Sequence, residues 1–121
     1  MDFRSRVALW MEPAWARRAR EAFAASPIDG WVAIDARAAA VFSAALAEQL
    51  PPGHHIAGTR WRAVGRVGGQ DDVLFAAHDG RFAAVHLTWQ KETDPRWPRA
   101  GLFASLDAAR DAIAWRDEVD D

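Results

Sequence analysis

The sequence predicts a single α+β domain spanning residues 1–121, in which a small antiparallel β-meander of about three strands packs against N-terminal helices and a C-terminal helix. Apolar residues recur at helical spacing as far as Leu50, and after Pro51 they alternate with polar residues as in strands. A last helical pattern follows near the C-terminus. Half of the residues are hydrophobic, which is enough for a globular core.

Two helices are expected at the N-terminal end. The first has Asp2 available as a cap and carries apolar residues at helical spacing: Phe3, Val7, Trp10 and Met11. A second helix can begin at Pro13, because proline fits the first turn of a helix. Its apolar stripe comprises Trp15, Ala19, Ala22 and Phe23. Residues 31–34 (WVAI) are too few to assign, and fit either a strand or the lead-in to the next helix.

A third helix is expected from Asp35, which is a suitable N-cap. One face of this helix collects the apolar residues Ala38, Val41, Phe42, Ala45, Leu46 and Leu50. The run Pro51-Pro52-Gly53 ends it, because proline cannot continue a helix.

The strands come next. Residues 60–67 alternate, with Arg60, Arg62 and Arg66 on one side and Trp61, Ala63 and Val67 on the other. Residues 72–89 form a hairpin about Asp79-Gly80. A two-residue turn would pair Val73 with His86, whereas a three-residue loop with Gly80 left-handed would pair Asp72 with His86. The second register is favoured because it gathers one apolar face: Phe75, Ala83, Val85, Leu87 and Trp89.

The final helix is expected from about Ser105 to Arg116, with Asp107 near its positive N-terminal end. Its inward residues are Leu106, Ala109 and Ile113, joined by Phe103. We expect the helices to cover one face of the small sheet, since such a sheet needs a covering layer. Residues 119–121 are expected to be a frayed acidic tail.

Composition excludes several classes of function. Without cysteine there is no disulfide framework, thiolate chemistry or zinc finger. A net charge of −2 disfavours a nucleic-acid partner. No apolar run reaches membrane-spanning length, and Arg4, Arg6 and Glu12 interrupt the N-terminal apolar residues, so we expect a cytoplasmic protein without a membrane partner. No cofactor and no metal site are expected, because His54 and His55 lack further ligands at a usable spacing.

A candidate catalytic site involves His86. In either hairpin register, Asp71 or Asp72 shares a face with His86 and Thr88, and an aspartate could orient the imidazole for acid–base work. The alternative is structural, with the aspartate satisfying backbone groups at the strand end. No G-x-S-x-G motif supplies a nucleophile.

A candidate interaction surface combines Trp97 with Arg60, Arg62 and Arg66. Trp97 lies between Pro95 and Pro98, which stiffen the chain. It could either cover the core or anchor a partner. The arginines could bind phosphates, although a solvated strand face explains them as well.

Four motifs occur in order: LPPGHH, DDVLF, DGRFAAVHLTW and DPRWP. Together they resemble a group of small uncharacterised bacterial proteins with the pattern LPPGH…RA…DDVLF…DGR[FY]AVVHLTW…WP. The resemblance covers roughly residues 50–105. It implies no catalytic residues, and the segment WQKETDPRWP departs from the shorter, often glycine-containing linkers of that pattern.

The sequence thus supports two hypotheses. The first is a non-catalytic protein-interaction domain of the immunity or adaptor type, whose partner is another protein or a second copy in a homodimer. It rests on the small size, the seven tryptophans and a charge asymmetry between the basic residues 60–106 and the acidic residues 107–121. The second is a small hydrolase or ligand-binding enzyme that uses His86 with Asp71 or Asp72.

Overall fold

The computed structural model describes residues 11–69 and 71–119, and side chains as far as Ala114. The predicted first helix from Asp2 and residues 120–121 of the predicted acidic tail lie outside this part of the chain. The described elements, in order, are α2 (Ala14–Ala25), β1 (Trp31–Ala33), α3 (Ala36–Gln49), β2 (Trp61–Val67), β3 (Asp72–Ala77), β4 (Phe82–His86), β5 (Ala100–Phe103) and α4 (Leu106–Val119).

The α+β class and the antiparallel sheet are confirmed, but within the described residues the sheet has five strands, not about three. Their order follows the chain, β1-β2-β3-β4-β5. The unassigned WVAI segment is the edge strand β1, paired with the end of β2. The other edge strand, β5, was not predicted. It is short and begins with Ala100-Gly101, which have low strand propensity, so it depends on pairing with β4.

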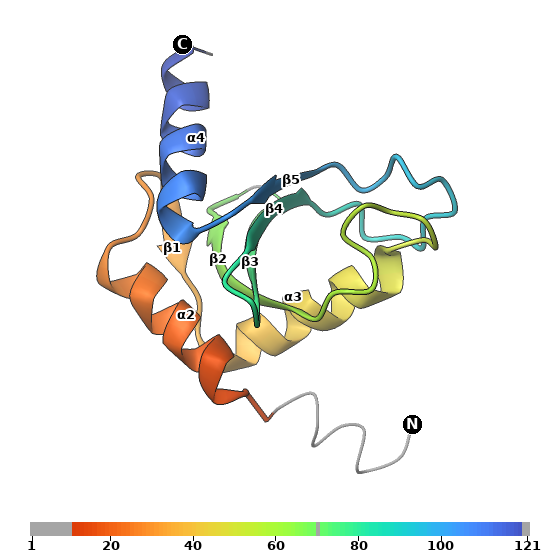
Figure 1. Ribbon diagram of the computed structural model, residues 1–121, viewed down its shortest axis with the longest axis horizontal. Helices are drawn as coiled ribbons and strands as arrows, with labels where there is room; N and C mark the ends of the chain where they lie inside the picture. The colour runs from red at the N-terminus through yellow and green to blue at the C-terminus, as the bar shows by residue number, and fades with distance from the viewer. Residues whose placement is uncertain (1–10, 70, 120–121) are drawn as a thin grey trace.

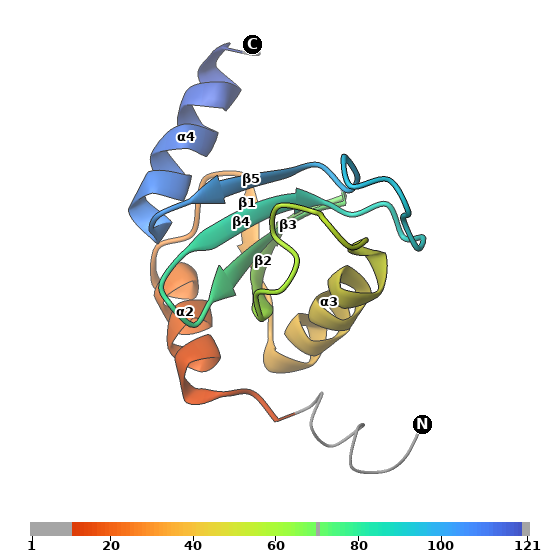
Figure 2. The ribbon, with the colours of Figure 1, turned by 45° about the vertical axis from the view of Figure 1, so that its right-hand side comes forward.

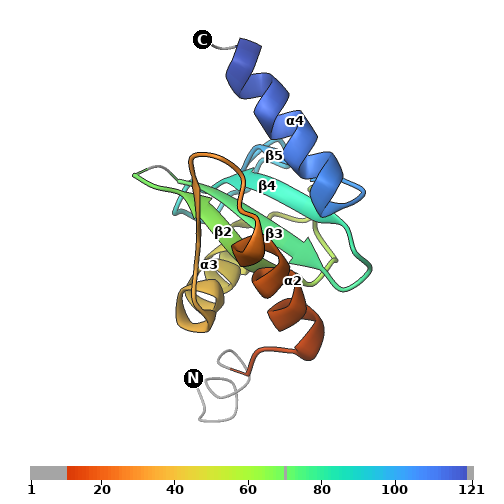
Figure 3. The ribbon, with the colours of Figure 1, turned by 90° about the vertical axis from the view of Figure 1, so that its left-hand side faces the viewer.

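Helices cover both faces of the sheet, so the expectation of one covered face is wrong. Figure 1 shows α3 on one side of the sheet and α2 and α4 on the other, and Figure 3 gives the view from the α2 side. The core is accordingly split into two clusters, one centred on Phe75 beneath α3 and one centred on Phe23 beneath α2. Strands β2 and β3 are buried along almost their whole length, because neither of their faces meets water.

The favoured hairpin register is confirmed. Asp72 pairs with His86 across β3 and β4, and Gly80 has a φ of 92°. The inward stripe of Phe75, Ala83, Val85 and Leu87 lies in the core cluster beneath α3. Trp89 does not join it: this side chain is 52% exposed, because the strand ends at His86 and the alternation stops there.

A bulge in β2 separates the predicted arginine stripe. The register with β3 shifts between Ala63 and Gly65, so the alternation of faces changes there. Arg62 lies in the buried region beneath α2, whereas Arg66 lies over the Phe42 ring on the α3 side. At Gly65 the Phe23 ring packs directly on the backbone, so any side chain would overlap it.

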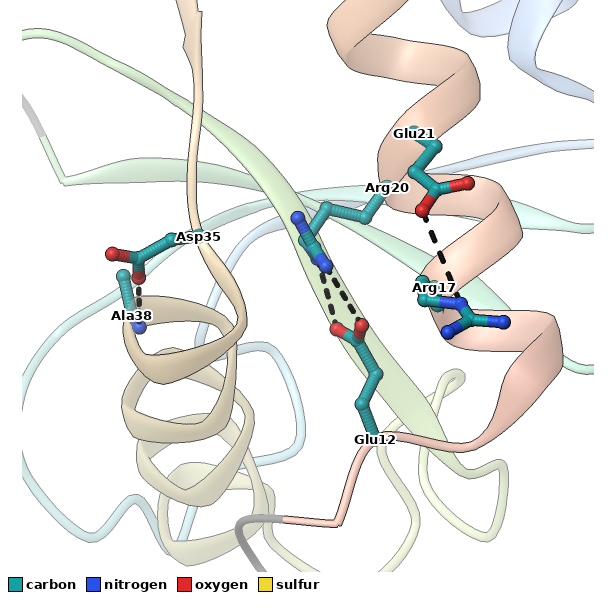
Figure 4. Close-up of polar contacts among 6 residues, drawn as sticks. All are labelled: Glu12, Arg17, Arg20, Glu21, Asp35 and Ala38. Carbon is teal, nitrogen blue, oxygen red and sulfur yellow. Dashed lines mark hydrogen bonds and ion pairs between the residues drawn. The ribbon is translucent and has the colours of Figure 1, made fainter.

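Helix α3 begins and ends as predicted, but its buried face is rotated about the helix axis relative to the predicted apolar face. Asp35 caps the helix by accepting a hydrogen bond from Ala38 N at 2.8 Å (Figure 4). Val41, expected inside, is exposed, while Ser43 and Gln49 are buried. The Ser43 hydroxyl donates to Ala39 O and accepts from Ala63 N, so the buried hydroxyl ties α3 to β2.

The final helix begins as predicted but extends to Val119, past the expected end near Arg116, so the first residue of the predicted tail is helical. Ser105 Oγ accepts from Ala108 N at 3.0 Å and caps α4. Ala109 is fully buried, and Leu106, Ile113 and Phe103 pack on the cluster beneath α2. In the part of the chain that the structure describes, no helix has the length and apolarity needed to cross a membrane.

Residues 87–99, here called the exit segment, connect β4 to β5 and extend past the sheet (Figure 2). The two histidines of LPPGHH hold its far end. Ile56 N donates to His54 Nδ1, so His54 Nε2 carries the proton and donates to Pro98 O at 2.6 Å. His55 Nε2 bonds Ala100 O at 3.1 Å, and the two rings stack 4.7 Å apart.

Candidate functional site

His86 and Asp72 meet at the end of the β3–β4 pair. His86 Nδ1 lies 2.9 Å from Asp72 Oδ1, and because a carboxylate only accepts, the ring nitrogen donates. Both side chains are accessible to solvent. The register therefore selects Asp72 over Asp71 as the partner of the imidazole. The pair leaves Nε2 of His86 available for proton transfer, but it lies on an open surface.

Asp71 instead holds Trp89. Trp89 Nε1 donates to Asp71 Oδ1 at 2.9 Å, and Asp71 O accepts from Leu87 N at 3.0 Å. Trp89 has a φ of 59°, a left-handed conformation that is uncommon for a bulky side chain and costs about 1–2 kcal/mol. The indole also packs against Phe42 of α3, with ring centroids 6.0 Å apart. A large apolar side chain is thus held in one orientation while half of it faces water.

Thr88 turns away from His86 and toward α3. Its backbone N–H and its hydroxyl both bond Gln49 Oε1, at 2.8 and 3.2 Å. Gln49 is only 2% exposed, and its backbone carbonyl accepts from Glu92 N at 3.3 Å. Gln49 therefore ties the chain on both sides of the bend around Trp89 to the end of α3. Of the predicted group of His86, an aspartate and Thr88, the structure brings His86 and Asp72 together, but the Thr88 side chain bonds Gln49 instead.

A hollow of about 530 Å³ lies between the end of α3 and the start of the exit segment. Its volume falls within the range of ligand pockets. The lining residues are Ala45, Ala47, Glu48, Gln49, Leu50, Trp89, Gln90 and Lys91. Neither His86 nor Asp72 lines it, so the hollow and the candidate catalytic pair are separate features.

The helix end that borders this hollow has backbone carbonyls without helical partners. The carbonyls of Ala47 and Glu48 would require N–H groups at positions 51 and 52, and both positions are proline. Leu46 O is served by Leu50 N at 3.1 Å. Together with the helix dipole, the two carbonyls give the α3 end a partial negative charge.

Of the predicted interaction residues, Arg66 lies nearest to this region. Its guanidinium is 5.9 Å from the centre of the Phe42 ring, the same ring that packs against Trp89. Arg60 precedes the opposite end of β2, about 20 Å away along the strand. The three arginines and Trp97 therefore do not form a single patch.

Trp97 occupies the far end of the exit segment and is 38% exposed. Arg99 lies over its ring at 5.2 Å, and Trp97 N donates to Asp94 O at 3.0 Å. Asp94 in turn accepts several bonds from Arg96, whose side chain and backbone N–H lower the pKa of Asp94 to about 2. The neighbouring Pro98 is fully buried, so this end is fixed through the proline more than through the indole.

A second group of charges lies beneath α2. Arg62 is 5% exposed, and its Nε and Nη2 atoms have no hydrogen-bond partner among the described residues. Burial lowers the pKa of Arg62. The nearby carboxylate of Glu12 is bound to Arg20 through two hydrogen bonds of 2.9 Å (Figure 4). Because Arg62 is buried, it does not belong to the surface that a partner could reach.

No group of three or more potential metal ligands occurs in the described residues. In His54 both ring nitrogens are engaged by backbone groups, which leaves neither for a metal. Ser43 is likewise occupied by two backbone bonds and Ser105 by the cap of α4. These side chains serve the fold.

Sequence reasoning missed the hollow and placed Trp89 inside the core. Pro51-Pro52 directly after a helix indicates that two carbonyls of the last turn lack helical partners, but no residue pattern indicates the hollow itself. The direction of Trp89 has no local signal, since it depends on a bend whose bonds come from Asp71 and Gln49.

Comparisons of the chain with protein-family models, with curated proteins and with solved structures gave no match. The resemblance carried by LPPGHH, DDVLF, DGRFAAVHLTW and DPRWP stays a prediction.

Proposed function

We propose that this domain is a non-catalytic interaction module that binds another protein through the surface around Trp89. The observation that carries the proposal is the exposed indole, held by Asp71 and Phe42 at the wall of the hollow. Tryptophans that are fixed in place and accessible are frequent energetic anchors of protein interfaces. Because the indole is already ordered, little side-chain entropy is lost on binding.

The surroundings of Trp89 supply the other parts of an interface. Leu50 and Ala45 extend the apolar wall, and Glu48, Gln90 and Lys91 provide a polar rim. The uncommon backbone conformation of Trp89 supports the same conclusion, since local strain is often retained where a side chain must be presented.

The test is recovery of a stoichiometric partner from the native host with tagged protein, followed by the same experiment with Trp89→Ala. We expect the variant to lose the partner, and Trp97→Ala, an exposed tryptophan of the same segment, to retain it. Undiminished recovery with Trp89→Ala would overturn the proposal. Dimerisation of the purified protein that Trp89→Ala abolishes would instead identify a second copy as the occupant.

The alternative function is a small hydrolase or ligand-binding enzyme in which Asp72 orients His86. It is favoured by the 2.9 Å hydrogen bond between the two side chains. It is weakened by their open position outside the hollow and by the engagement of the Thr88 hydroxyl with Gln49. Hydrolysis of a panel of model esters and phosphoesters that His86→Gln abolishes would favour the enzyme over the interaction module.

A further inference from the structure

We propose that the hollow beside Trp89 receives an arginine side chain of the protein partner. In this arrangement the guanidinium lies against the Trp89 indole and donates hydrogen bonds to the carbonyls of Ala47 and Glu48. The inference rests on the proposed function and names the chemistry that the surface recognises.

The first support is the supply of hydrogen-bond acceptors. Pro51 and Pro52 lack N–H groups, so the carbonyls of Ala47 and Glu48 cannot be satisfied by the next turn of α3. Both residues line the hollow. The last turn of a helix favours donors and cations, because its unpaired carbonyls carry the negative end of the helix dipole.

The second support is the balance of charge. Among the side chains that line the hollow, Glu48 and Lys91 carry opposite charges and offset each other. The charge of the ligand that the hollow favours then depends on the helix end and on the face of the indole, and both favour a cation. The Lys91 side chain is exposed and has a flexible stem, so it can turn toward solvent, whereas the carbonyls are fixed by the helix.

The third support is shape. A planar guanidinium stacks on an aromatic ring and presents five donors, enough for two carbonyls and the Glu48 carboxylate. A lysine ammonium is a compact, strongly hydrated charge that does not stack in this way. The hollow of about 530 Å³ has room for a guanidinium and the methylene groups behind it.

The experiment is an NMR titration of the whole protein with N-acetyl-arginine amide, in which the indole N–H resonance of Trp89 is followed. Trp89→Phe assigns that resonance by its disappearance. The matched control ligand is N-acetyl-citrulline amide, which has nearly the same shape and no charge. We expect saturable shifts of the Trp89 indole with the arginine derivative and much weaker binding of the citrulline derivative.

A matched pair of variants tests the placement. Glu48→Gln should weaken binding of the arginine derivative about two- to fivefold, the range for an exposed ion pair. Glu21→Gln, which removes an exposed glutamate from α2, should leave binding unchanged. Both positions are exposed on helices, so neither variant is expected to unfold the domain.

The outcomes separate this inference from the proposed function. Absence of Trp89 shifts, or equal binding of the citrulline derivative, would overturn the inference, and the proposed function would stand if partner recovery still depended on Trp89. If Trp89→Ala left partner recovery unchanged, both would be overturned, even if the arginine derivative bound.

Discussion

The exit segment carries an exposed tryptophan near each end, and the two are held in different ways. Trp89 is fixed through its own side chain, by a hydrogen bond to Asp71 and by contact with Phe42. Trp97 is placed by its neighbours, since Pro98 is buried and its carbonyl accepts a hydrogen bond from His54, while Arg99 lies over the indole. The end of the segment at Trp97 therefore contributes to the stability of the fold, whereas the end at Trp89 holds a side chain at the surface. Substitutions at each end should therefore affect different properties.

The largest effect on stability is expected at the far end, from His54→Ala. His54 is 4% exposed, and its removal leaves Pro98 O and Ile56 N without partners in the interior. We expect a loss of about 2–4 kcal/mol in the free energy of unfolding, measured by urea denaturation. His55→Ala removes one bond from an exposed residue and should cost less than about 1 kcal/mol. Equal losses in the two variants would contradict the distinction between these histidines.

A smaller effect is expected at the near end, from Gln49→Leu. The substitution removes the acceptor for the backbone N–H and the hydroxyl of Thr88, and should cost about 1–3 kcal/mol in urea denaturation. The same variant should broaden or shift the indole resonance of Trp89, because the bend is no longer tied to α3. Thr88→Ser keeps both donors to Gln49 and should preserve that resonance. An unchanged Trp89 signal in Gln49→Leu would show that Gln49 does not position the indole.

The smallest effect is expected at Asp94, and it depends on pH. Hydrogen bonds from Arg96 lower the pKa of Asp94 to about 2, below the unfolded value of about 3.9. The stabilisation is therefore present above about pH 4 and is lost as the pH falls toward 2. In acid titrations of stability, wild type should exceed Asp94→Asn near neutral pH, and the two should converge near pH 2. A difference that grows with acidity would contradict this sign. Asp111→Asn, an exposed substitution on α4, is the control.

Much of the fold could be predicted because its signals are local. The cap at Asp35, the end of α3 before Pro51 and the register set by Gly80 depend on the conformational limits of single residues. The edge strand β5 could not be predicted, since Ala100-Gly101 become a strand only through pairing with β4. The continuous apolar run VLFAA in β3 is typical of a strand that is buried on both faces, but the expectation of one covered face did not use this signal.

The candidate site was predicted less completely than the fold. The contact between Asp72 and His86 followed from the hairpin register. The predicted arginine stripe was wrong because a bulge at Val64 changes the alternation of faces, and the sign of that bulge, a glycine at position 65 inside the strand, was not used. Trp89 was misplaced because period-two alternation was extended three residues beyond the last residue of β4. Bonds from distant residues, Asp71 and Gln49, determine the direction of that side chain.

The central claim is that Trp89, and not Trp97, provides the binding energy for a protein partner. The most direct test is isothermal titration calorimetry of the recovered partner against wild type, Trp89→Ala and Trp97→Ala. We expect Trp89→Ala to weaken the affinity by about thirtyfold or more, as for an interface hot spot, and Trp97→Ala to change it by less than about threefold. Equal affinities of wild type and Trp89→Ala, or a larger loss with Trp97→Ala, would contradict it.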